Sequence, residues 1–345
     1  MNRIIGGKKS PAGAQVRWVE VDAESAGQRL DNFLLRQLKG VPKTHVYRII
    51  RSGEVRVNKG RAAADTRVAP GDRIRLPPLR LAEPASRPAA VAPGRPVRDL
   101  PVLYEDEALL AVNKPAGLAV HGGSGISLGL IEQLRLARPQ APLLELVHRL
   151  DRETSGILLV AKKRSALKSL QDQFRERETG KTYLALVAGQ WPLNRKVLDK
   201  PLHKYLLEDG ERRVRVVGRD DPDGMKAVTL VKVRARSGGA VAPAPAGYSL
   251  LEVTIKTGRT HQIRVHLASE GMPIVGDDKY GDFELNKALQ KSPGEPGAVA
   301  LKRMFLHAWR LQFKHPVSGE RIELCAPLPP ELQQFLAQVL PAAPH

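Results

Sequence analysis

The chain has 345 residues, of which 42% are hydrophobic, and 55 Lys and Arg against 36 Asp and Glu give it a formal net charge of +19. This length allows two or three domains, and so positive a field favours polyanionic partners, nucleic acid above all. No apolar run approaches the roughly 20 residues that span a bilayer, and the N-terminus lacks the apolar segment of a signal peptide, so a cytoplasmic protein without membrane partners is expected. The single Cys325 excludes an internal disulfide and is expected to be a small buried hydrophobe.

The first 77 residues predict a small helical module with short strands. Residues 1–16 are expected to be disordered because they have little to bury. A strand is predicted over 17–22, a helix from about Gln28, a second helix over Lys43–Arg51, and short strands at 54–57 and 73–76. These elements would form a compact domain over residues 17–77.

This module is strongly basic, with nine Lys or Arg between Gln28 and Ala62 against Asp31 and Glu54. Aromatic residues make up only 4% of the chain, which favours contact with phosphates over base stacking. The runs RLDNFL, VYRIIRSGEVRVN and PGDRI resemble the S4 RNA-binding domain. The resemblance implies that structured RNA is bound through its backbone. The expected RNA contacts are Arg29, Arg36, Lys43, Arg48, Arg51, Arg56 and Lys59.

A Pro-, Ala- and Arg-rich linker is predicted at residues 78–98, followed by a larger domain over residues 99–340. Its short β runs are predicted around 102–104, 109–112, 157–160, 183–187, 228–231 and 249–253. Helices are predicted at about 127–138, 165–177 and 330–339. This order predicts an α+β fold with a large mixed, mostly antiparallel sheet. Residues 237–247 are expected to form a flexible hairpin insert, and the acidic run at 220–223 has no assigned role.

Asp151 lies in the run HRLDRETSG, directly before an apolar stretch. Arg149 and Arg152 are close in sequence, and nearby cations keep a carboxylate ionised. An ionised carboxylate can act as a nucleophile or a base. Taken alone, the pattern also fits an ordinary surface salt bridge.

The run TGRTHQIRVHL, residues 257–267, is predicted to be a strand. Alternation would place His261 and His266 on opposite faces, which disfavours a shared metal. Arg264 is the preferred partner for Asp151 because a guanidinium can direct two parallel hydrogen bonds to one carboxylate.

A third run, GKTYLALV, places Tyr183 at the start of an apolar strand, where it is either a core residue or a site residue. With HRLDRETSG around Asp151 and RTHQIRVH around Arg264, it resembles the RluA-type pseudouridine synthases. Further matches are NKPAGLAVH at 113–121, DDKYG at 277–281 and FLHA at 305–308. The resemblance covers about residues 20–335.

The resemblance implies that a uridine in RNA is cleaved at its N-glycosidic bond and rejoined through C5, with no cofactor or metal. The substrate would be 23S ribosomal RNA, free or in an assembly intermediate, and the enzyme a monomer. By motif, Asp151 is the catalytic carboxylate, which either attacks C1′ or drives a glycal-type elimination. Tyr183 packs under the uracil and is placed to help remove the C5 proton, and Arg264 fixes the Asp151 carboxylate.

Two further residues are implied by motif. Arg149 would fill the space that a flipped base leaves. Leu306 either lines the base pocket or belongs to the core.

Three other functions are weighed against this one. An inert RNA-binding or ribosome-assembly factor would not require all three site residues in their motifs. The segment HRLD alone suggests a kinase, but neither a glycine-rich phosphate loop nor a DFG segment accompanies it. A metal-dependent RNA hydrolase would cleave its RNA and lose activity in a chelator.

Overall fold

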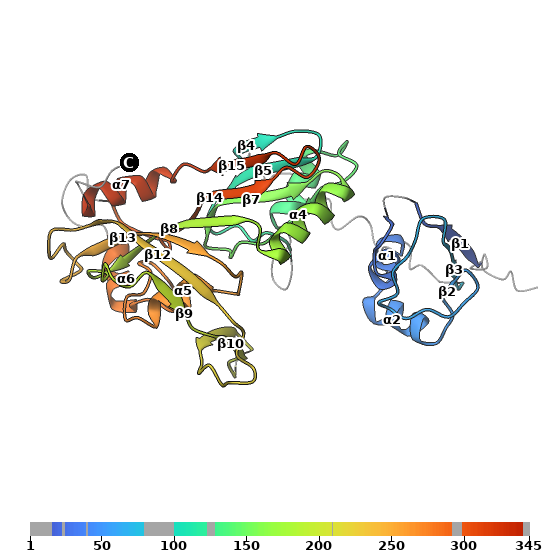
Figure 1. Cartoon of the computed structure of the whole chain (residues 1–345), viewed down its shortest axis with the longest axis horizontal. Helices are drawn as coiled ribbons and strands as arrows, with labels where there is room; N and C mark the ends of the chain where they lie inside the picture. The colour runs from blue at the N-terminus through green and yellow to red at the C-terminus, as the bar shows by residue number, and fades with distance from the viewer. Residues whose placement is uncertain are drawn as a thin grey trace, which may run out of the picture. The chain divides into compact units, whose positions relative to one another are not determined.

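The computed structural model describes residues 16–22, 25–38, 41–78, 100–122, 128–208, 210–291 and 299–340. The chain divides into two compact units, Met1–Pro96 and Val97–His345, which are described separately (Figure 1). The expected disorder at residues 1–16, apart from Val16, and the expected linker at 78–98, apart from Pro78, lie outside the described residues. Among the described helices, none is long and apolar enough to cross a membrane.

The N-terminal unit packs two helices on a three-stranded sheet. The sheet runs in the antiparallel order β1 (Arg17–Glu20), β3 (Arg73–Leu76) and β2 (Arg56–Val57). Helices α1 (Leu30–Gln37) and α2 (Lys43–Arg51) each bury one apolar face, with Phe33 and Ile49 1% and 0% exposed. Because each helix commits only that face to the core, most of its basic side chains remain in solvent.

The larger unit is built on a ten-stranded sheet that is antiparallel except for one pair. Its path is β4 (Val102–Glu105), β5 (Leu109–Lys114), β7 (Ser155–Ala161), β14 (Leu306–Lys314), β8 (Gly180–Ala188), β13 (Tyr248–Ile255), β12 (Val228–Arg236) and β9 (Val197–Asp199), with β6 (Glu145–Leu146) on β7 and β15 (Arg321–Cys325) on β14. Among the described strands, only β7 and β14 run parallel. All seven residues of β7 are buried, which explains its unbroken apolar sequence. The predicted α+β fold with a mixed, mostly antiparallel sheet is confirmed.

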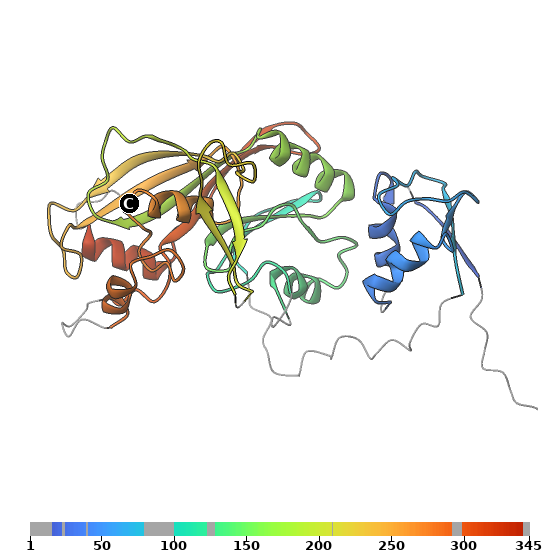
Figure 2. The ribbon, with the colours of Figure 1, turned by 90° about the horizontal axis from the view of Figure 1, so that it is seen from below.

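Five helices and a separate hairpin complete this unit. The helices are α3 (Leu130–Ala137), α4 (Arg164–Glu176), α5 (Gln262–Ala268), α6 (Phe283–Gln290) and α7 (Pro330–Val339). Helix α4 covers the half of the sheet that holds β7, whereas α7 packs at the other half, as both views show (Figure 2). The hairpin of β10 (Leu202–Leu206) and β11 (Arg212–Val216) projects from the body of the unit (Figure 1).

Most predicted elements exist, but the strand predicted over 257–267 is wrong. Strand β13 ends at Ile255, and α5 begins at Gln262 after a left-handed residue, His261, with φ 51°. Six of the seven residues of α5 are buried, so the one-sided apolar stripe with a 3.6-residue period that marks a surface helix is missing. The strand prediction assumed the two-residue alternation of a strand, which this segment does not adopt.

Cys325 and residues 237–247 are two further places where the sequence made a prediction. Cys325 is exposed rather than buried, because it follows the inward-facing Leu324 on β15 and strand side chains alternate. Residues 237–247 connect β12 to β13, and Ser237 holds both ends by donating to the Gly239 carbonyl and accepting from the Tyr248 amide. The loop therefore closes an ordinary hairpin of the large sheet.

Candidate active site

Asp151 sits in the loop between β6 and β7, with its side chain 32% exposed. The Thr154 amide donates to the Asp151 carbonyl at 3.2 Å. Buried Lys114, at the end of β5, donates from Nζ to the carbonyls of Pro115, Leu118 and Arg152 at 2.9–3.0 Å. Burial lowers the pKa of Lys114 to about 7. The loop that carries Asp151 is thus tied to the end of β5 through the carbonyl of the next residue, Arg152.

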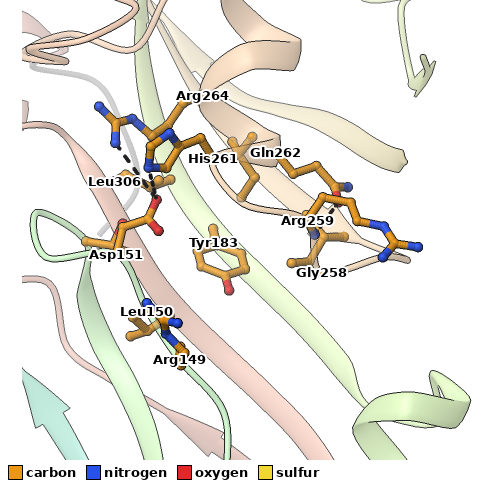
Figure 3. A pocket seen from close by; sticks show the side chains of 13 residues that line it. Arg149, Leu150, Asp151, Tyr183, Gly258, Arg259, His261, Gln262, Arg264 and Leu306 are labelled. Carbon is orange, nitrogen blue, oxygen red and sulfur yellow. Dashed lines mark hydrogen bonds and ion pairs between the residues drawn. The ribbon is translucent and has the colours of Figure 1, made fainter. Parts of the chain in front are cut away.

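Asp151 opens onto a cavity of about 110 Å³. The cavity brings together all five residues that the motifs assigned to catalysis or base handling (Figure 3). Its lining consists of Arg149, Leu150, Asp151, Thr154, Tyr183, Ile255, Gly258, Arg259, His261, Gln262, Ile263, Arg264 and Leu306. These residues come from the β6–β7 loop, β8, the end of β13, the loop before α5, α5 itself and β14.

Arg264 is buried, and its Nη1 lies 3.9 Å from Asp151 Oδ2. The two parallel hydrogen bonds expected toward Asp151 go instead to Asp277, from Nε at 2.7 Å and from Nη2 at 2.5 Å. Nη2 also donates to Asp278 at 3.1 Å. Burial opposes the charge of Arg264, but its hydrogen bonds to Asp277 hold its pKa above the ordinary value. Burial likewise opposes the charge of Asp277, but the Arg264 guanidinium lowers the pKa of Asp277. Arg264 is therefore a fixed cation that turns one remaining nitrogen toward Asp151.

His261 is the site residue whose contacts sequence reasoning missed. Its Nε2 lies 3.9 Å from the same Asp151 oxygen, and its Nδ1 lies 2.8 Å from the Tyr280 hydroxyl. Burial lowers the pKa of His261, more than the charge of Asp151 raises it. The DDKYG run contains both Asp277 and Tyr280, so the signal was present in the sequence without a role attached to it.

Tyr183 lines the cavity from β8. Burial raises the pKa of Tyr183, and the negative charge of Asp151 raises it further. The side chain is therefore a neutral phenol at physiological pH, which favours packing against a base over accepting a proton in the resting state.

The two base-handling candidates differ in exposure. Arg149 is exposed at the mouth of the cavity. Leu306 is 3% exposed, lines the cavity and also packs in the apolar cluster around Trp191 and Leu251. Leu306 therefore belongs both to the cavity wall and to the core, and its contact with a base stays a prediction.

The two histidines of the 257–267 run do not meet. His266 is buried away from Asp151, with Nδ1 at 2.8 Å from Thr229 Oγ1 and Nε2 at 3.0 Å from the Lys200 carbonyl. The acidic run at 220–223 instead approaches His203, with ligand atoms of His203, Asp221 and Asp223 within 4.8 Å of one another. Exposed acidic groups of this kind are common on protein surfaces and indicate no metal by themselves.

Comparison with known proteins gives this geometry a family. The model of the RNA pseudouridylate synthase family matches residues 108–269. Ribosomal large subunit pseudouridine synthase C of Escherichia coli strain K12 is 48% identical over 94% of this chain and 97% of its own length. The protein of the same name from Pasteurella multocida strain Pm70 is 47% identical over 93% of both chains.

The chain belongs to the RNA pseudouridylate synthase family.

Solved structures agree with this assignment. Human RNA pseudouridylate synthase domain containing 1 has a TM-score of 0.55 and 30% identity, covering 69% of this chain and 88% of its own. Human RNA pseudouridylate synthase domain containing 4 has a TM-score of 0.54 and 29% identity, covering 69% and 92%. In this pseudouridylate synthase the S4 domain model also matches, at residues 28–74.

The S4 domain carries most of the expected RNA contacts on its surface. Five of the seven are exposed, namely Arg36, Lys43, Arg48, Arg51 and Lys59. Arg29 donates to the buried Asp31 at 2.7 and 3.2 Å, and Arg56 is half-buried. These two are consequently less available to phosphates than the sequence suggested.

Proposed function

We propose that this protein is a pseudouridine synthase of the ribosomal large subunit, which isomerises specific uridines of 23S ribosomal RNA to pseudouridine. One observation supports it above the others: Asp151 opens onto a cavity in which Arg264 and His261 both lie 3.9 Å from one of its oxygens. The relatives that cover nearly the whole chain carry the matching name.

In this proposal Asp151 supplies the reacting carboxylate. The bond between N1 and C1′ of uridine breaks, the uracil turns, and a bond forms between C5 and C1′ as C5 gives up its proton and N1 gains one. Asp151 either attacks C1′ or removes a sugar proton in an elimination, and both routes require its ionised form. The fixed positive charge of Arg264 stabilises that form.

Tyr183 and Leu306 would contact the flipped uracil, and Arg149 would fill the space that the uracil leaves in the RNA stack. A phenol ring and a leucine side chain on the cavity wall offer apolar surface to a planar base. A base must leave its stack to reach Asp151, which costs a few kcal/mol. Exposed Arg149 can occupy the vacated space and contact the flanking phosphates.

The exposed basic side chains of the S4 domain would offset this cost through phosphate contacts. We place the protein in the cytoplasm, acting as a monomer on free ribosomal RNA or on a large-subunit assembly intermediate. Its net charge of +19 would also attract RNA electrostatically and speed their encounter.

The test is pseudouridine mapping of a 23S ribosomal RNA transcript incubated with the full-length protein. New pseudouridine at defined positions supports the proposal. If it forms equally well in the presence of a chelator and the RNA remains uncleaved, a metal-dependent hydrolase is excluded. RNA that is bound but carries no new pseudouridine, in both the free transcript and assembly intermediates, would favour an inert RNA-binding factor.

A further inference from the structure

His261 and Tyr280 form a chain of hydrogen bonds that ends at the candidate catalytic carboxylate. The Val214 amide on β11 donates to the Tyr280 hydroxyl oxygen at 3.0 Å. The same hydroxyl lies 2.8 Å from His261 Nδ1. His261 Nε2 faces Asp151 Oδ2 at 3.9 Å (Figure 3). The Tyr280 ring lies edge-on to the imidazole, with ring centroids 5.5 Å apart.

The direction of each hydrogen bond in this chain follows from donor counting. The Val214 amide can only donate, so the Tyr280 oxygen accepts from it. Among the described residues His261 Nδ1 is the other partner of this hydroxyl, so the buried phenol proton is paired only if Tyr280 donates to Nδ1. Burial raises the pKa of Tyr280, so the phenol keeps that proton. Burial lowers the pKa of His261, so the imidazole is neutral and can accept it. A neutral imidazole that accepts at Nδ1 must carry its hydrogen on Nε2, the atom turned toward Asp151.

We propose that Tyr280 fixes His261 in its Nε2–H tautomer, and that His261 together with Arg264 restrains one oxygen of Asp151 so that the other faces the nucleotide. The proposal rests on the proposed function, because it assigns positioning residues to that reaction. At 3.9 Å both contacts are longer than hydrogen bonds. Such contacts commonly shorten when substrate closes a site.

The β10–β11 hairpin is joined to the same chain. Arg213 donates to the Lys279 carbonyl at 2.6 Å, and Lys279 pairs with Glu211 of the hairpin. The guanidinium groups of Arg213 and Arg264 lie 5.7 and 5.2 Å from the centre of the Tyr280 ring. Segment 279–280 is therefore held between the hairpin and α5, which keeps the Tyr280 hydroxyl at a fixed distance from His261.

Single-turnover kinetics on a 23S ribosomal RNA transcript test the inference. Tyr280→Phe removes only the hydroxyl, and we expect the single-turnover rate constant to fall about 10- to 100-fold, as for a misplaced catalytic group, while the Kd for RNA stays within about twofold. Tyr104→Phe is the control, because the Tyr104 hydroxyl is likewise hydrogen-bonded to a side chain, Asp106 at 2.8 Å, but Tyr104 on β4 does not line the cavity. The control is expected to react at the wild-type rate.

Two substitutions of His261 separate tautomer control from backbone strain. The amide nitrogen of His261→Gln reaches the Nε2 position, whereas that of His261→Asn reaches only the Nδ1 position. We expect Gln to retain about tenfold more activity than Asn, since only Gln can donate to Asp151. If the left-handed backbone at residue 261 were the whole role, Asn would be the better replacement, because it tolerates that region more easily.

A double-mutant cycle then decides the role of Tyr280. A glutamine has no tautomer to set, so Tyr280→Phe should cost little in the His261→Gln background. An equal cost in both backgrounds would overturn the inference. Wild-type activity on the same transcript keeps this result separate from the proposed function, which would fail only if the unaltered protein made no pseudouridine.

Discussion

One oxygen of the Asp151 carboxylate faces two nitrogen atoms of fixed side chains. Asp277 holds Arg264 and Tyr280 holds His261, so the guanidinium and the imidazole keep their positions relative to Asp151 Oδ2. In our proposal the second oxygen is the one that faces the nucleotide. This arrangement gives each neighbouring residue a separate measurable effect.

Replacing Asp151 tests the reacting carboxylate. Asp151→Asn keeps the size of the side chain but removes the charge, so turnover should fall at least about 10³-fold, as when other catalytic residues are removed. RNA affinity should survive, because the S4 domain contacts are unaltered. Pseudouridine formation and RNA binding are measured on the same transcript. Substantial residual turnover would contradict the assignment.

Replacing Asp277 tests the buried anchor of Arg264. Asp277→Asn leaves a buried guanidinium without its charge partner, which should lower the free energy of unfolding by about 3–5 kcal/mol. Asp278→Asn is the control. Asp278 contacts the same guanidinium but is 58% exposed, so its loss should cost less than about 1 kcal/mol. Denaturant unfolding measures both, and similar costs would refute the role of Asp277.

At the level of elements, the parallel pair β7–β14 places the site. Ser155 and Gly156 lie opposite His307 and Ala308, which sets Leu306 beside the loop that carries Asp151. Gly156 has φ 112°, and a Cβ there would lie 2.2 Å from the Ala308 carbonyl oxygen. Only glycine allows the two strands to approach this closely.

Gly156→Ala should therefore push β14 away from the catalytic loop. We expect unfolding free energy to fall by about 3 kcal/mol or more, from overpacking and the positive φ, and activity to fall with it. Gly117→Ala is the matched control, since Gly117 has φ 77° but nothing within 4 Å of the added carbon. Equal unfolding midpoints for the two variants would exclude the steric explanation.

His307 on β14 predicts how stability depends on pH. It is fully buried, with Nδ1 at 2.8 Å from Ser155 Oγ and Nε2 at 3.2 Å from the Ala326 carbonyl. Burial lowers the pKa of His307 to about 4. Below the ordinary pKa of about 6.5, the unfolded chain takes up a proton that the folded state excludes.

The His307 contribution to the unfolding free energy is therefore complete above pH 6.5 and declines as the pH falls toward 4, by at most about 1.4 kcal/mol per pH unit. His307→Gln has no such proton to bind. Denaturant unfolding between pH 7 and 4.5 should show a shallower decline for the variant than for the wild type, and parallel curves would refute the prediction.

At the scale of the whole molecule, the two units have separate apolar cores. Deleting residues 1–80 should therefore leave the large unit folded while weakening binding to ribosomal RNA. The dependence of log affinity on log salt concentration should also become less steep, because fewer phosphates are neutralised. Unchanged affinity at physiological salt would contradict this role of the S4 domain.

The sequence by itself determined much of this protein. Its charge indicated a polyanionic partner, its periodicities predicted most helices and strands, and its motifs named the residues that meet at the cavity. These properties are local, since a hydrophobic period or a run such as HRLDRETSG is complete within a few residues.

Only the tertiary structure decided which side chains face one another. The sequence favoured Asp151 as the acceptor of two parallel hydrogen bonds from Arg264, yet Asp277 accepts that pair and Asp151 faces a single nitrogen at 3.9 Å. The helix α5 and the link from Tyr280 to His261 were likewise hidden. A helix that is buried on nearly all sides lacks the one-sided apolar stripe that reveals a helix in a sequence. A hydrogen bond between distant segments depends on the packing of the whole chain, which no local pattern records.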